Sequence, residues 1–114
     1  MLNLERRRRR GETLDEALKF QLAACAEDEG LAAMVLADDE GLCVAAWGDS
    51  GICEEVASRA PLAPGDDSTD AHKLWFGQIE LYLCAVGGES QARKRSLERS
   101  ASGVSRILGR WMVA

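Results

Sequence analysis

Residues 31–48 read Leu-Ala-Ala-Met-Val-Leu-Ala-Asp-Asp-Glu-Gly-Leu-Cys-Val-Ala-Ala-Trp-Gly. Two apolar runs, at 31–37 and 42–47, flank the polar tetrapeptide Asp-Asp-Glu-Gly at 38–41. Apolar runs of this length bounded by turn-forming residues are typical of strands, and Gly41 tolerates the positive φ that a tight turn requires. The stretch therefore predicts a β-hairpin buried on at least one face, which the flanking segments must cover.

Helical and strand patterns alternate on both sides of the hairpin. Apolar residues spaced by three or four predict helices over residues 14–29, 50–60 and 90–112. Residues 74–76 and 79–86 predict two more strands around a short turn, after a loop at 61–70. Short links between consecutive strands favour antiparallel pairing. The predicted fold class is therefore α+β, in which three helices cover a meander-like antiparallel sheet.

Length and composition indicate one globular domain. The chain has 114 residues, of which 46% are hydrophobic and 29% are charged. We assign residues 1–12 to a basic N-terminal tail and residues 13–114 to the domain. The sequence contains no apolar run of about 18 residues that would suggest a membrane span, and no apolar signal region follows the arginines. The expected location is the cytoplasm.

Charge is distributed unevenly along the chain. Residues 1–10 contain five arginines and one glutamate, and residues 91–114 contain six basic residues and one glutamate, whereas residues 11–90 contain three basic and seventeen acidic residues. Such asymmetry bears on partners more than on fold. The candidate basic residues for partner binding are Arg6, Arg7, Arg8, Arg9, Arg10, Arg93 and Arg99. An alternative function is therefore binding of nucleic acid or an anionic membrane through the basic termini.

Residues suited to catalysis are few and scattered. Ser90 lies between a strand and a helix, as in a nucleophile elbow, but His72 is the only histidine and precedes it, so Ser90 is better explained as a helix N-cap. The cysteines have no metal-ligand spacing, and they are expected to be small buried hydrophobes: Cys25, Cys43, Cys53 and Cys84. We expect no catalytic, cofactor-binding or metal-binding residues. A hydrolase or redox enzyme that uses Ser90 or a cysteine is the enzymatic alternative.

The order of elements resembles the Roadblock family, also described as dynein light chain roadblock type. The resemblance rests on the hairpin at 34–45, with Gly-Leu-Cys-Val-Ala at 41–45, on the strand Leu-Tyr-Leu-Cys-Ala-Val-Gly at 81–87, and on the helical segment 103–108. The family has a profilin-like antiparallel sheet, usually with three strands between its second and third helices. The implied order is α-β-β-α-β-β-(β)-α, in which the loop at 61–70 is the place for a fifth strand.

The resemblance implies a protein without catalytic activity. Family members dimerise by joining two sheets edge to edge, and they regulate or scaffold small Ras-like GTPases or serve as dynein light chains. The implied interface lies on the second helix and third strand, with the candidate residues Ile52, Val56, Arg59, Leu74, Trp75 and Phe76. We therefore expect a homodimer, or a heterodimer with a related chain, that binds a small GTPase. The first and third helices are expected to pack on the same side of the sheet.

Overall fold

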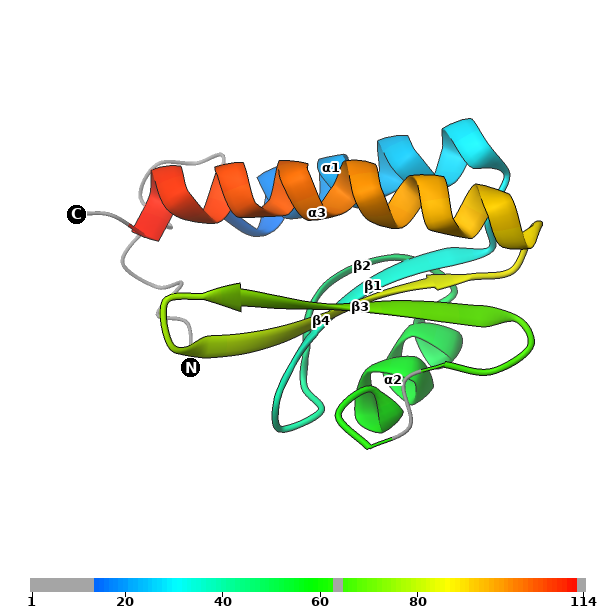
Figure 1. The fold of residues 1–114 in the computed structure, drawn as a ribbon, viewed down its shortest axis with the longest axis horizontal. Coiled ribbons are helices and arrows are strands. Elements are labelled where there is room, and N and C mark those ends of the chain that lie inside the picture. The colour runs from blue at the N-terminus through cyan, green and yellow to red at the C-terminus, as the bar shows by residue number, and fades with distance from the viewer. Residues whose placement is uncertain (1–13, 63–64, 113–114) are drawn as a thin grey trace.

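The computed structural model describes residues 14–62 and 65–112. Its elements are, in chain order, α1 (Leu14–Glu29), β1 (Ala33–Asp38), β2 (Cys43–Gly48), α2 (Ser50–Arg59), β3 (Thr69–Phe76), β4 (Ile79–Val86) and α3 (Ser90–Met112). Helices α1 and α3 cover one face of the sheet and α2 lies on the other (Figure 1). The α+β class and the packing of the first and third helices on one side are thus confirmed.

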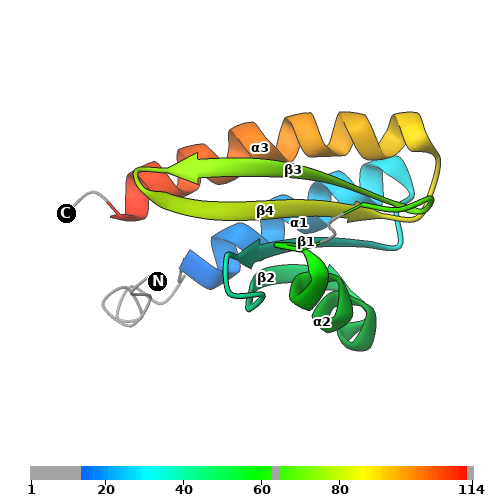
Figure 2. The ribbon, with the colours of Figure 1, turned by 60° about the horizontal axis from the view of Figure 1, so that its bottom comes forward.

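The four strands form one antiparallel sheet in the order β2-β1-β4-β3. The sheet is not the predicted meander, because β1 pairs with β4 in its centre and β2 and β3 form the two edges (Figure 2). Strand β3 begins at Thr69, five residues before the predicted strand. The described part of the chain contains no fifth strand between α2 and α3, only an isolated bridge between Asp66 and Thr69.

The β1–β2 hairpin forms as predicted. The Asp38 carboxylate accepts hydrogen bonds from the backbone N–H groups of Glu40 at 2.9 Å and Leu42 at 3.0 Å. Gly41 adopts a φ of 82°, a value that residues with a side chain rarely take. The turn is therefore closed by an Asx-type interaction at its start and a left-handed glycine near its end.

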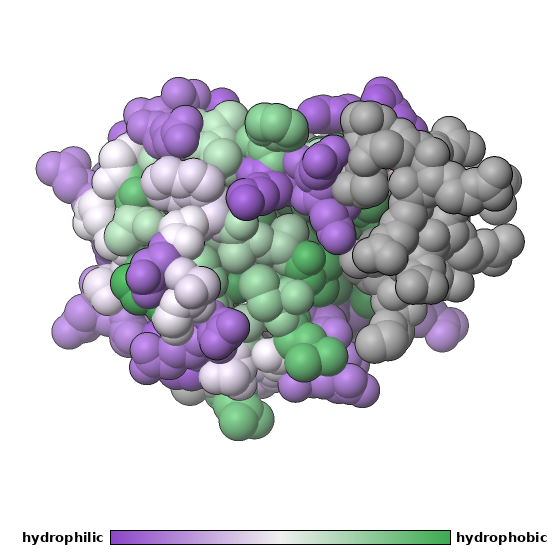
Figure 3. Space-filling view, turned by 180° about the vertical axis from the view of Figure 1, so that it is seen from behind, coloured by the Kyte–Doolittle hydropathy of each residue, from purple (hydrophilic) through white to green (hydrophobic). Residues whose placement is uncertain are grey.

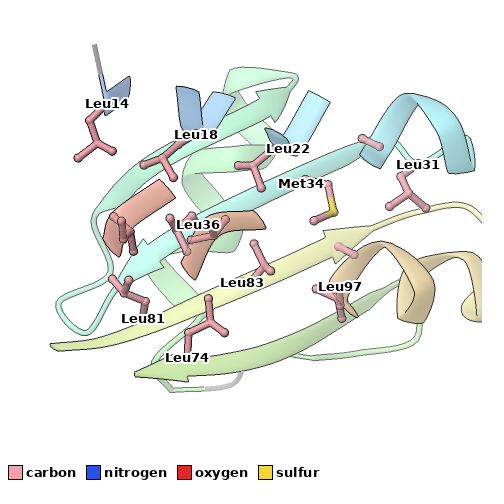
Figure 4. Packing of buried hydrophobic residues seen from close by; sticks show 14 of the residues in the cluster. Leu14, Leu18, Leu22, Leu31, Met34, Leu36, Leu74, Leu81, Leu83 and Leu97 are labelled. Atoms are coloured by element: carbon pink, nitrogen blue, oxygen red, sulfur yellow. The ribbon is translucent and has the colours of Figure 1, made fainter. Parts of the chain in front are cut away.

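Alternation along β1 separates two apolar clusters. Met34 and Leu36 face α1 and α3. They form one cluster with Leu18 and Leu22 of α1 and Leu83 of β4 (Figure 4). The intervening β1 residues are Ala33, Val35 and Ala37, and they pack with residues of α2. Burial of one leucine side chain contributes about 2 kcal/mol, whereas an exposed ion pair contributes less than about 1 kcal/mol. The two clusters, and not the surface ion pairs, therefore provide most of the stability.

Candidate interaction surface

Strand β3 presents a long unpaired edge. All eight of its residues pair with β4 on one side, and no described strand pairs with the other side. Strand β2 is the second edge, but it has six residues, and its register with β1 shifts between Leu36 and Ala37. Irregular, short edges resist further pairing, whereas long regular edges promote it. Of the two edges, β3 is therefore better suited to accept another strand.

Side chains of β3 alternate between the helix-covered face and the face that carries α2. Leu74 is 9% exposed and belongs to the larger cluster, and Phe76 is half-buried against it. Trp75 points to the other face and is 62% exposed. The Leu74 side chain thus completes the chain's own core, and its place in a dimer interface stays a prediction. Trp75 is the large apolar side chain that this edge exposes.

Helix α2 exposes one of its two predicted apolar interface residues. Asp49 caps the helix by accepting from the backbone N–H of Ile52 at 3.0 Å, and the Ile52 side chain is 39% exposed. Val56 is 4% exposed and packs with Val35 of β1. Val56 belongs to the apolar stripe with which this short helix covers the sheet, and its role in a dimer interface stays a prediction.

Arg59 is the last residue of α2, and its side chain contacts the segment that leads into β3. Its Nη1 donates to the Asp66 carboxylate at 3.3 Å, and its Nε is buried without a hydrogen-bond partner among the described residues. The pKa of Asp66 is lowered, mainly because its carboxylate accepts a hydrogen bond from the backbone N–H of Ser68, with a smaller effect of Arg59. Arg59 thus fixes the loop before β3 while keeping one donor unused.

Three further residues beside Trp75 were not predicted as part of this surface. Lys73 forms an ion pair with Glu80 at 2.8 Å, and its ammonium group lies 5.8 Å from the centre of the Tyr82 ring. The hydrogen bond between Lys73 and Glu80 raises the pKa of Lys73 and lowers that of Glu80. The polar alternation of residues 79–83 in the sequence was the available signal, but two of their cross-strand partners on β3, His72 and Lys73, lay outside the predicted strand at 74–76.

The two predicted basic residues that the structure describes, Arg93 and Arg99, have different surroundings. Arg93 is 6% exposed, and its guanidinium donates to the Asp70 carboxylate at 2.9 Å and to the carbonyl oxygens of Gly87 and Gly88. These acceptors hold the Arg93 guanidinium inside the fold, and its role in partner binding stays a prediction. Arg99 is exposed and pairs with Asp28 at 3.2 Å. Arg6–Arg10 lie outside the described residues.

The thiols are poorly suited to nucleophilic chemistry. Cys25, Cys53 and Cys84 are buried as predicted, whereas Cys43 is exposed, because it lies on the β2 edge next to the turn. Burial raises the pKa of Cys84 to about 11 and is also the main cause of the raised pKa of Cys53. A thiol with a raised pKa contains little thiolate at neutral pH, and the thiolate is the nucleophile.

Ser90 and His72, the residues of the enzymatic alternative, lie at the start of α3 and within β3. Helix α3 begins at Ser90, and the carbonyl oxygen of Glu89 accepts from the N–H of Arg93 at 3.0 Å, so Glu89 rather than Ser90 takes the cap position. His72 is exposed in the middle of β3, not at its end.

Among the described residues, no group of three His, Cys, Asp or Glu side chains is placed to hold a metal ion. No helix in that part of the chain is both long and apolar enough to span a bilayer.

Comparison with known proteins gives matches by structure. No protein-family model and no curated protein matches the sequence. The structure of MglB from Myxococcus xanthus superposes with a TM-score of 0.63 at 11% identity, covering 96% of this chain and 94% of MglB. The gliding protein MglB from Thermus thermophilus gives a TM-score of 0.59 at 14% identity, covering 85% of this chain and 92% of that one.

A further solved structure describes MglB with a tetrameric arrangement. It superposes with a TM-score of 0.60 at 16% identity and covers 85% of this chain and 91% of its own. At identities this low, the superpositions establish a shared fold and nothing more. The superposed parts extend over most of both chains. By its fold, the chain is an α+β domain like that of MglB.

Proposed function

We propose that this chain is a non-catalytic regulator or adaptor of a small Ras-like GTPase and that it acts as a dimer with itself or with a related chain. The observation that supports the proposal most strongly is the structural similarity to MglB, which extends over 96% of this chain. The Roadblock family, which the sequence resembles, supplies the expected class of partner.

The β3 edge supports the dimeric part of the proposal. Its outer N–H and C=O groups gain partners when a second β3 strand pairs with it, and a two-fold axis makes such a contact self-complementary. Trp75 and Ile52 supply exposed apolar area on the α2 side of the sheet. Aromatic side chains of this kind are common at the centres of protein interfaces. We place Arg59 near this surface, with Leu74, Phe76 and Val56 supporting it from the core.

A regulator of this type acts on the conformation of its partner. Small GTPases switch through segments that are ordered in one nucleotide state and released in the other, so a protein that binds one state more tightly shifts the equilibrium toward it. Such action needs a shaped surface and no nucleophile or metal of its own. The raised thiol pKa values agree with this mode of action.

The proposal is tested by binding and turnover together. The full chain is immobilised and presented with small Ras-like GTPases loaded with GDP or with a non-hydrolysable GTP analogue. We expect one GTPase to be retained in one nucleotide state, and its rate of GTP hydrolysis is then measured with and without the chain. A changed rate identifies a regulator, and an unchanged rate with retained binding identifies an adaptor. Failure to bind any GTPase in either state would refute the proposal.

A further inference from the structure

The outer edge of β3 offers hydrogen-bonding groups at alternate residues. The carbonyl oxygen of Val86 accepts from the backbone N–H of Ala32 at 2.8 Å, so Val86 directs its backbone groups away from β3. Its register partner Thr69 therefore points its own N–H and C=O outward from the sheet. Because the pairing with β4 is regular, every second residue after Thr69 also points its groups outward: Ala71, Lys73 and Trp75.

The start of this edge is already paired within the chain. Thr69 donates to the carbonyl oxygen of Asp66 at 3.3 Å and accepts from the N–H of Asp66 at 2.9 Å. Both outward groups of Thr69 are thus used. Among the described residues, the outward groups of β3 that have no partner strand are those of Ala71, Lys73 and Trp75, and they are placed symmetrically about Lys73.

Apolar exposure alone does not single out this edge. Figure 3, the side opposite to the view of Figure 1, also shows apolar side chains surrounded by hydrophilic ones. Strand β2, the other edge, is interrupted by a register shift in its pairing with β1. The regular spacing of the outward groups, rather than apolar area, therefore selects β3.

Symmetry restricts how two copies of this edge can pair. Residues opposite each other in an antiparallel pair share a face of the sheet, so a two-fold axis must pass beside one residue and its own copy. An axis at Lys73 gives all three free residues a hydrogen-bonded partner. An axis at His72 leaves Trp75 without one, because it lies opposite the occupied Thr69. An axis at Leu74 leaves Ala71 beyond the end of the partner strand.

We propose that a second copy of this chain pairs with β3 in the register that places Lys73 opposite its own copy. Trp75, which is 62% exposed, then lies opposite the small side chain of Ala71 in the second copy, on the α2 face of the sheet. The same large side chain meets the same small one on the other side of the axis. This inference rests on the dimeric part of the proposed function and specifies the partner as an identical chain.

The ion pair between Lys73 and Glu80 makes this register electrostatically possible. Two lysines directly opposite each other on neighbouring strands repel. Each Lys73 lies 2.8 Å from the carboxylate of Glu80 on its own β4, and the Glu80 side chain is 23% exposed. Each copy therefore brings its own counter-ion to the axis, and the centre of the interface carries no net charge.

Cross-linking tests the register. Lys73→Cys and Ala71→Cys are each made in a Cys43→Ser background, which removes the exposed thiol, and are treated with a short bismaleimide at high protein concentration. In the proposed register the two Cα atoms at position 73 lie about 5.5 Å apart, whereas those at position 71 lie about 14 Å apart. We expect a covalent dimer from Lys73→Cys and loss of this product with Ala71→Cys. Equal yields, or a higher yield from Ala71→Cys, would overturn the register.

Sedimentation equilibrium tests the role of the ion pair. Glu80→Gln leaves two Lys73 ammonium groups without counter-ions near the axis, so it should weaken dimerisation about fivefold in about 0.1 M salt and less in about 1 M salt. The matched control is Glu27→Gln, which changes the charge equally on exposed α1, on the other side of the sheet from α2, and should leave the dimer unchanged.

The outcomes separate this inference from the proposed function. A Glu80→Gln chain that dimerises as tightly as the wild type, in a dimer that Lys73→Cys does not cross-link, refutes the register and leaves the dimer itself in place. A wild-type chain that is monomeric at high concentration refutes the dimer as well. Retention of a small GTPase is measured separately and does not depend on either result.

Discussion

Arg93 Nε donates to Asp70 Oδ2 at 2.9 Å, and this contact joins the first turn of α3 to the start of β3. The same guanidinium donates to the carbonyl oxygens of Gly87 and Gly88 and, from Nη2, to that of Asp67 at 3.2 Å. One side chain therefore holds the turn after β4, the loop before β3 and the helix together. It fixes the end of the strand whose edge we propose as an interface.

Arg93→Met should lower the free energy of unfolding by about 2 to 3 kcal/mol, because it leaves Asp70 and three carbonyl oxygens without a buried donor. Urea denaturation followed by circular dichroism measures the change. The control is Arg99→Met, which removes an exposed ion pair from the same helix and should cost less than about 1 kcal/mol. Equal losses in the two variants would show that Arg93 has no special structural role.

The burial of Arg93 shows where sequence patterns stop being informative. Helix periodicity, the hairpin turn and the apolar stripe of α1 follow from neighbouring residues, so the elements and the helix layer were predictable. The partners of Arg93 lie up to 26 residues away, at Asp67. The pairing of β1 with β4 is similarly remote, which explains why the order of strands was predicted wrongly. The polar first half of β3 was missed because His72 and Lys73 interrupt the apolar pattern of a strand.

Gly103 allows the close approach of α1 and α3. A Cβ atom at this position would collide with the side-chain amide of Gln21. Gly103→Ala should therefore be nearly neutral alone, because a gain of about 1 kcal/mol in helix propensity is offset by displacement of Gln21. With Gln21→Ala in the background, the same change should stabilise the fold by about 1 kcal/mol. A double-mutant cycle by urea denaturation measures this coupling, and strict additivity would contradict it.

Acid should destabilise the fold through Glu29. The hydrogen bond from Arg95 lowers the pKa of Glu29 below its ordinary value of 4.5. A carboxyl group whose pKa is lower in the folded state stabilises that state above pH 4.5, and this contribution is lost as the pH falls through the lowered pKa. Glu29→Gln should therefore reduce the loss of stability on acidification.

Urea denaturation at a series of pH values from neutral to acid measures this slope. Arg95→Met provides an independent variant, because it removes the donor of the same hydrogen bonds. These bonds to the Glu29 carboxylate are 2.8 to 3.2 Å long. We expect the two variants to reduce the acid slope in the same direction. A slope that neither substitution changes would exclude the Glu29–Arg95 pair as a source of acid sensitivity.

Trp75→Ser should dissociate the proposed dimer. Trp75 is 62% exposed in the monomer, so the change should leave the free energy of unfolding of that monomer within about 0.5 kcal/mol of its original value. Loss of an aromatic anchor at the centre of an interface costs about 2 kcal/mol or more, which weakens association about thirtyfold. Ile52→Ser should act in the same direction with a smaller effect. Sedimentation equilibrium over a range of concentrations measures both.

Phe20→Ser is the matched control for this experiment. Phe20 is also an exposed aromatic residue, but it lies on α1, on the other side of the sheet from α2. Its loss should leave the dimer intact, because α1 covers the face of the sheet opposite to α2. A wild-type chain that sediments as a monomer at high concentration, or a dimer that depends on Phe20 and not on Trp75, would exclude the β3 edge as the interface.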